Sequence, residues 1–167
     1  MTTETFELKK ISHDGIEHAL EKSRHYRLLN EPEQAESLCL DILEIEPNNQ
    51  AALVIVVLAL TDQFANDGAS RTIRRANEYI AKLSNEYHKL YYAGIVYERE
   101  GRATLRRHMA HAEAYACFRD AMHCYEKANE IKPEHNDDAI QRWNSCARTI
   151  MKENLCAPKQ EEESFLE

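Results

Sequence analysis

The stretch 51–60, AALVIVVLAL, holds ten residues without a polar side chain, although 30% of the chain is charged. It is about half the ~20 residues that a helix needs to span a bilayer. A helix that is apolar on all sides is covered by neighbouring elements in a folded protein. The stretch therefore predicts a buried helix, continuing to about residue 64, with other helices packed around it.

Chain breakers divide the rest of the sequence into segments with apolar residues at helical spacing. Asp14 and Glu17 form a capping-box pattern at the start of the first segment, and Gly101 is expected to interrupt the pattern between the fifth and sixth. No strand pattern is as strong as these. The predicted helices cover 14–29, 32–45, 51–64, 69–84, 86–100, 103–131 and 137–153.

The sequence therefore predicts an all-α fold in a single domain over 13–153. An N-terminal arm over 1–12 precedes it. An acidic tail over 154–167, ending in EEESFLE, follows it and is expected to be disordered. The helix over 137–153 is expected to close one end of the domain.

A spacing pattern of small, aromatic and apolar residues occurs twice along the chain. The first copy runs Ser23-x2-Tyr26, then Ala35-x3-Cys39-x2-Ile42-x4-Pro47, and the second runs Gly94-x2-Tyr97, then Ala121-x3-Tyr125-x2-Ala128-x4-Pro133. This resembles the tetratricopeptide repeat, a pair of antiparallel helices with small and aromatic residues at such positions. Small residues let helix backbones approach closely, and the tyrosines are expected to fill the space between them.

The resemblance implies a right-handed array of about three helix hairpins, covering 14–49, 50–85 and 86–135, with 137–153 as a capping helix. The middle unit lacks a closing proline, and the third has fifteen residues more than regular spacing requires. An unrelated all-α bundle is the alternative.

The resemblance also implies a concave groove, lined by the first helix of each hairpin, that receives a peptide or helix of a partner protein. The groove is expected to be apolar and aromatic in the middle, with arginines at its edges. Its expected lining is Leu20, Arg24, Arg27, Leu28, Val54, Leu58, Tyr91, Ile95, Glu98 and Arg99. A partner, the chain's own arm with Phe6, Leu8 and Ile11, or a second copy of the chain would cover such a surface.

The amino-acid composition argues against some classes of partner and some cellular locations. A formal net charge of −8 argues against nucleic acid as the main partner. The five cysteines form no CxxC pair, which favours free thiols in a reducing cytoplasm. The N-terminal segment has no apolar signal core, so no membrane association is predicted.

No cofactor or catalytic site is predicted. The four glycines are isolated, so no phosphate-binding loop exists, and no nucleophile motif is present. Five possible metal ligands project from different sides of one predicted helix and do not converge on one ion: His108, His111, Cys117, His123 and Cys124. A two-residue metal site completed by another helix remains an alternative.

Arginines are concentrated in two groups along the chain, and each group can be interpreted in two ways. The first group is Arg71, Arg74 and Arg75, and the second is Arg99, Arg102, Arg106 and Arg107. They form either solvated helix faces paired with acids such as Glu98 and Glu100, or a docking patch for an acidic partner segment.

The sequence thus predicts a non-catalytic protein-interaction module, an adaptor or chaperone-type protein. A structural homo-oligomer with a self-occupied groove and a metal-binding helical bundle are the alternatives.

Overall fold

The computed structural model describes residues 3–65, 69–107 and 111–158. Within these ranges the chain forms seven α-helices and no β-strand. The prediction of an all-α fold is therefore confirmed.

The helices begin and end close to the predicted positions because prolines and N-cap side chains mark them. Pro32 occupies the first turn of α2, and the Asn49 side chain accepts a hydrogen bond from the Ala52 amide at the start of α3. The helices are α1 (Ile16–Leu28), α2 (Pro32–Ile45), α3 (Gln50–Asp62), α4 (Ala69–Ala81), α5 (Glu86–Arg106), α6 (His111–Glu130) and α7 (Asp138–Lys152).

Three predicted helix boundaries are wrong. Asp14 makes no capping hydrogen bond, because a 3-10 turn over His13–Gly15 places Gly15 at the N-cap of α1. Gly101 does not break the helical pattern but lies inside α5, which continues to Arg106, and α6 begins at His111 rather than at residue 103. A Cβ at Gly101 would lie 3.2 Å from Cys117 Cβ, so this glycine allows α5 and α6 to approach closely. The extra residues of the third unit therefore lengthen both α5 and α6.

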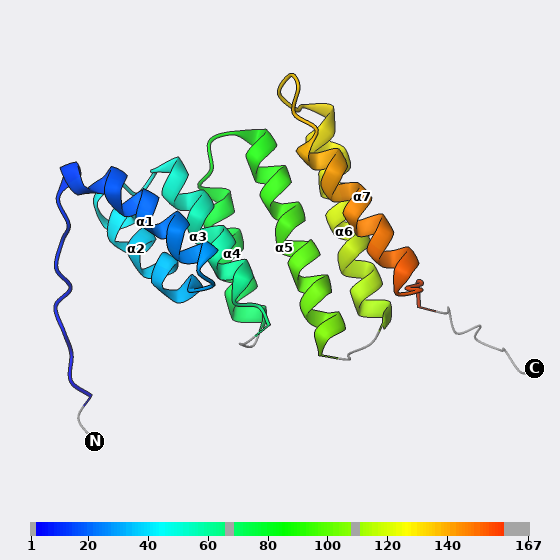
Figure 1. Cartoon of the computed structure of the whole chain (residues 1–167), viewed down its shortest axis with the longest axis horizontal. Coiled ribbons are helices and arrows are strands. Elements are labelled where there is room, and N and C mark those ends of the chain that lie inside the picture. The colour runs from blue at the N-terminus through cyan, green and yellow to red at the C-terminus, as the bar shows by residue number, and fades with distance from the viewer. Residues whose placement is uncertain (1–2, 66–68, 108–110, 159–167) are drawn as a thin grey trace, which may run out of the picture.

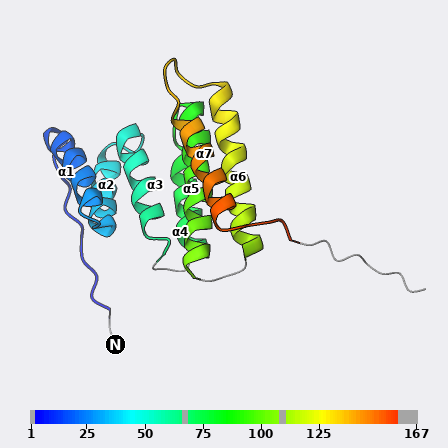
Figure 2. The ribbon, with the colours of Figure 1, turned by 45° about the vertical axis from the view of Figure 1, so that its right-hand side comes forward.

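Successive helices pack against each other along the molecule (Figure 1). In addition, α1 contacts α3 and α3 contacts α5, so the first helices of the pairs α1–α2, α3–α4 and α5–α6 adjoin one another. Figure 2 shows α1 and α2 at one end of the molecule and α5, α6 and α7 gathered at the other.

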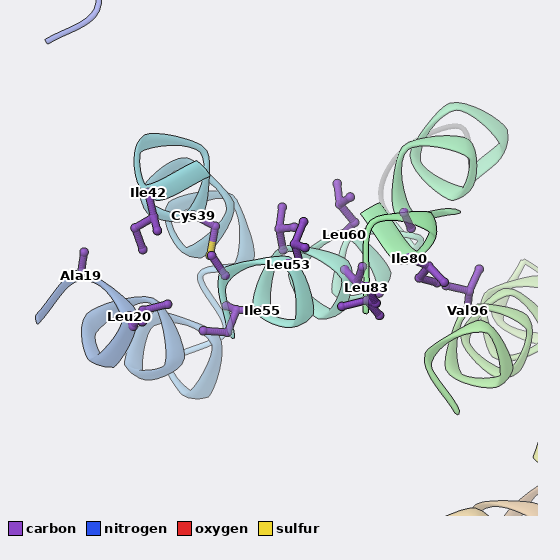
Figure 3. Close-up of a cluster of buried hydrophobic side chains, with 14 of the residues drawn as sticks. Ala19, Leu20, Cys39, Ile42, Leu53, Ile55, Leu60, Ile80, Leu83 and Val96 are labelled. Carbon is purple, nitrogen blue, oxygen red and sulfur yellow. The ribbon is translucent and has the colours of Figure 1, made fainter. Parts of the chain in front are cut away.

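One apolar cluster is centred on α3 and includes residues of α1, α2, α4 and α5 (Figure 3). No residue of 51–60 is exposed, because α3 contacts α1, α2, α4 and α5. Leu53, Val56 and Leu60 are inaccessible to solvent. The prediction that this stretch forms a buried helix is confirmed.

A second apolar cluster lies among α5, α6 and α7. Phe118, Tyr125 and Cys146 are almost fully buried there, and Leu155 adds a side chain from beyond the end of α7. Leu58 of α3 packs against this cluster from the other half of the molecule.

The described part of the N-terminal arm lies outside this helical body (Figure 1). Ile11 packs against the first apolar cluster, whereas Phe6 and Leu8 are exposed. Leu8, with Lys9 and Lys10, lies beside Leu40 on α2, which is not a first helix of a pair.

The five cysteines are free thiols. Burial raises the pKa of Cys39 to about 11 and that of Cys146 to about 12. Cys117 is half-buried, and burial together with nearby carboxylates raises its pKa to about 12. These thiols therefore remain protonated at neutral pH.

Gly94 packs directly against the ring of Tyr125, and a Cβ there would lie 2.5 Å from Tyr125 Cε1. We therefore expect Gly94→Ala to destabilise the protein by roughly 1–3 kcal/mol, measured by urea denaturation and circular dichroism. Gly101→Ala is the matched comparison. Its closest contact would be 3.2 Å, and the higher helix propensity of alanine, about 1 kcal/mol, offsets the crowding. Equal effects of the two substitutions would contradict this account of Gly94.

Candidate functional site

A pocket of about 480 Å³ lies where residues of α1, α3, α5 and α7 meet. Its lining includes five arginines and two carboxylates, an excess of three positive charges in a protein whose formal net charge is −8. These charged residues are Arg27, Asp62, Glu98, Arg99, Arg102, Arg106 and Arg142. A local basic pocket on an acidic protein is a candidate binding site for an anionic ligand.

Asp62, at the end of α3, joins two of the arginines. Arg27 of α1 donates from Nε to Asp62 Oδ2 at 2.8 Å, and Arg99 of α5 donates from Nη1 to Oδ1 at 3.0 Å. The three side chains are each less than a third exposed. We call this group the Asp62 triad.

Glu98 joins two further arginines, although its side chain is only 1% exposed. Arg102 donates to Glu98 Oε1 from Nε at 3.1 Å and from Nη2 at 3.0 Å. Arg142 of α7 donates from Nη1 to the same oxygen at 3.3 Å. We call this group the Glu98 triad.

Two more polar groups support the Glu98 triad. The Tyr125 hydroxyl donates to Glu98 Oε2 at 2.8 Å, and Arg102 Nη2 donates to Ser145 Oγ at 3.1 Å. Burial, and then the charge of Glu98, raise the pKa of Tyr125, so its hydroxyl stays a donor. Burial acts to lower the pKa of Arg142, but attraction to Glu98 together with the hydrogen bond to Tyr91 and the nearby Tyr125 raises it overall.

A second pocket, of about 420 Å³, shares Arg142 and Ser145 with the first. Tyr91, Asp138 and Gln141 complete its lining. The polar surface of the arginine pocket therefore continues along α7 towards Tyr91.

Four of the residues expected to line a groove do line these pockets. Arg27, Glu98 and Arg99 belong to the arginine pocket, and Tyr91 lines the second one. The lining of the arginine pocket is charged and differs from the apolar lining expected of the groove, because its centre is built from ion pairs between arginines and carboxylates.

The other expected groove residues do not line the arginine pocket. Leu20 and Ile95 are 3% and 2% exposed in the apolar clusters, so a partner has no access to them. Val54 and Leu58 are half-buried against these clusters because four helices surround α3. Arg24 and Leu28 are exposed on α1.

Sequence reasoning did not single out Asp62 or Arg142. Asp62 is the first acidic residue after the apolar stretch 51–60, which is a detectable signal. Arg142 sits between the apolar residues Ile140 and Trp143, and nothing in that local pattern marks it.

The positions of the spacing pattern fall into three groups. Pro47 and Pro133 follow the ends of α2 and α6. The buried positions are Ser23, Ala35, Cys39, Ile42, Gly94, Ala121, Tyr125 and Ala128. Tyr26 is half-buried and Tyr97 is exposed, so these two tyrosines do not fill the space between helices as expected.

The His and Cys side chains considered as possible metal ligands form no three-residue site within the described ranges. No group of three His, Cys, Asp or Glu side chains there has a geometry that could hold an ion. His108 lies outside the described residues. Among the described helices, none has the length and apolarity to cross a membrane.

The two groups of arginines have different environments. Arg75 forms an ion pair with Glu36 of α2, whereas Arg71 and Arg74 are exposed on α4. Arg99, Arg102 and Arg106 line the pocket, and Arg107 donates to the Phe64 carbonyl.

Comparison of the chain with protein-family models, with curated proteins and with solved structures gives no match in any of the three. The pocket's own chemistry therefore carries the functional proposal.

Glu98→Ala removes a buried carboxylate that binds three side chains. We expect it to lower the free energy of unfolding by about 2–4 kcal/mol, because the Tyr125 hydroxyl loses its acceptor and two arginines lose their counter-charge. Glu98→Gln retains an acceptor for Tyr125 and should cost less. Glu78→Ala, on the exposed face of α4, is the control and should change stability by less than about 0.5 kcal/mol. Urea denaturation curves measure all three, and a Glu98→Ala curve that matches the control would refute the structural role of the triad.

Glu100 is an expected ion-pair partner of the arginines, but it forms no ion pair with another described residue. It is half-buried, and burial followed by repulsion from Asp120 raises its pKa above the ordinary 4.5. When folding raises the pKa of an acid, the folded protein loses stability at pH values above that raised pKa, because the acid must then be ionised in an unfavourable environment. At pH values below the acid's ordinary pKa, the acid is protonated in both the folded and the unfolded state and no stability is lost.

We therefore expect Glu100→Gln to stabilise the protein at pH 7, with the gain shrinking as the pH falls towards about 4. Urea denaturation at both pH values measures this. Glu78→Gln, on the exposed face of α4, should show the same small change at both. A gain for Glu100→Gln that is as large at low pH as at pH 7 would contradict the prediction.

Proposed function

We propose that this protein is a non-catalytic interaction module that binds an acidic segment of a partner protein in the arginine pocket. The observation that carries the proposal is the excess of arginine over carboxylate in a pocket built by α1, α3, α5 and α7. Guanidinium groups pair with carboxylates through two parallel hydrogen bonds, which combines charge attraction with geometric specificity.

We further propose that the fold is a tetratricopeptide-like right-handed array of three helix pairs, with α7 as the capping helix. The contacts α1–α3 and α3–α5 support this, because first helices adjoin in such an array. The close packing of Gly94 on Tyr125 and the burial of Ala35, Ala121 and Ala128 agree with the repeat pattern. In such an array the arginine pocket lies on the surface formed by the first helices and the cap.

The described part of the arm leaves this pocket open. Leu8, Lys9 and Lys10 lie against α2 and do not contribute to the pocket lining. Of the three occupants considered from the sequence, a partner protein is therefore favoured over the N-terminal arm. The charge of the lining favours an acidic partner segment over the apolar helix or peptide expected from the sequence.

A fluorescent peptide of alternating serine and glutamate residues tests the proposal. We expect it to bind the full chain, whereas a peptide with glutamine in place of each glutamate should not. Raising NaCl from 50 to 300 mM should weaken binding about tenfold, because salt screens exposed charges. Fluorescence anisotropy measures both.

Two double arginine variants show whether the acidic peptide binds in the arginine pocket. Arg99→Gln with Arg106→Gln removes two pocket arginines, and Arg71→Gln with Arg74→Gln removes two exposed arginines of α4. The pocket pair should weaken binding at least about tenfold and the α4 pair much less, with circular dichroism confirming that both variants are folded. Equal losses would place the binding outside the pocket, and equal binding of the glutamine peptide would refute recognition of an acidic segment.

A further inference from the structure

The arginine pocket contains two similar charged groups rather than one diffuse basic surface. The Asp62 triad and the Glu98 triad each place one carboxylate between two arginines, so each carries one net positive charge. Arg106 adds a further charge to the lining. The pocket therefore has two positions at which a ligand carboxylate would be attracted.

Both triads retain hydrogen-bond donors for a ligand. A guanidinium group has five N–H donors, and Arg27 and Arg99 each use one nitrogen on Asp62. Arg142 uses Nη1 on Glu98 and also forms a side-chain hydrogen bond with Tyr91. The side chains of Arg27, Arg99, Arg102 and Arg142 are between 23% and 35% exposed, so their remaining donors are not sealed in the core.

The spacing of the triads favours a particular arrangement of ligand carboxylates. Arg99 and Arg102 are three residues apart on α5, which is about 4.5 Å along the helix axis. The Asp62 triad extends from α5 towards α1, and the Glu98 triad extends from α5 towards α7. In an extended peptide, side chains on one face are about 7 Å apart at positions i and i+2, whereas neighbouring side chains point to opposite faces.

We propose that the pocket binds an extended segment with acidic residues at positions i and i+2, one carboxylate on the Asp62 triad and the other on the Glu98 triad. This inference rests on the proposed function, since it specifies the partner segment that the pocket accepts. Each ligand carboxylate receives hydrogen bonds from guanidinium nitrogens that the resident carboxylate leaves unused. The ligand thereby contacts α1, α5 and α7 at once.

Three capped peptides of equal length and composition test the spacing. Each carries two glutamates in a serine–glycine host, at i and i+1, at i and i+2, or at i and i+4. With the full chain at low salt, we expect the i and i+2 peptide to bind at least about tenfold more tightly than either of the others. Affinities that are equal at all three spacings, or highest for the i and i+4 peptide, would overturn the inference while leaving recognition of acidic segments intact.

A single substitution in the Asp62 triad tests whether the ligand contacts both triads. Arg99→Gln should reduce the affinity of the i and i+2 peptide to that of a peptide with a single glutamate, and Arg74→Gln should not. If none of the acidic peptides binds to the folded chain, the proposed function itself fails. Inorganic phosphate at matched ionic strength should not displace the i and i+2 peptide, and displacement would show that the pocket selects a phosphoryl group instead.

Discussion

The buried carboxylate of Glu98 is the interaction on which the C-terminal half of the structure depends. It lies on α5 and binds Tyr125 of α6 and Arg142 of α7, so one side chain ties three helices together. Burying a carboxylate is unfavourable unless charged and hydrogen-bonding partners replace the water that it loses. Glu98 has those partners, and two of them also face the pocket. The same charge therefore orders the helices and positions the arginines.

The helices could be predicted from the sequence because local signals determine them. Pro32, Pro47 and Pro133 stop or start helices wherever they occur, and an apolar stretch such as 51–60 has to be covered. The arginine pocket could not be predicted in the same way. Arg27 and Asp62, and Glu98 and Arg142, are 35 and 44 residues apart in sequence, and only the packing of helices brings them together. Gly101 shows a further limit of prediction from sequence. A glycine can mark either the end of a helix or a place where two helices approach closely, and only the packing of the neighbouring helices decides between the two.

The contrast between the pocket and the rest of the surface affects how an acidic partner would be recognised. The chain as a whole has a formal net charge of −8, so at long range it would repel an acidic segment. Only at short range does the excess of arginine in the pocket reverse this repulsion. If the pocket binds an acidic segment as proposed, such a distribution would disfavour non-specific contacts, and binding would depend on direct pairing between guanidinium and carboxylate groups.

The apolar residues form two clusters, one around α3 and one among α5, α6 and α7. The Asp62 triad joins helices from both regions, with Arg27 and Asp62 on one side and Arg99 on the other. Val96 of α5 belongs to the first cluster and Leu58 of α3 packs against the second, so the two regions cannot rotate against each other without breaking apolar contacts. A molecule that bridges the two walls of the pocket would add a polar connection between the two regions to these apolar ones.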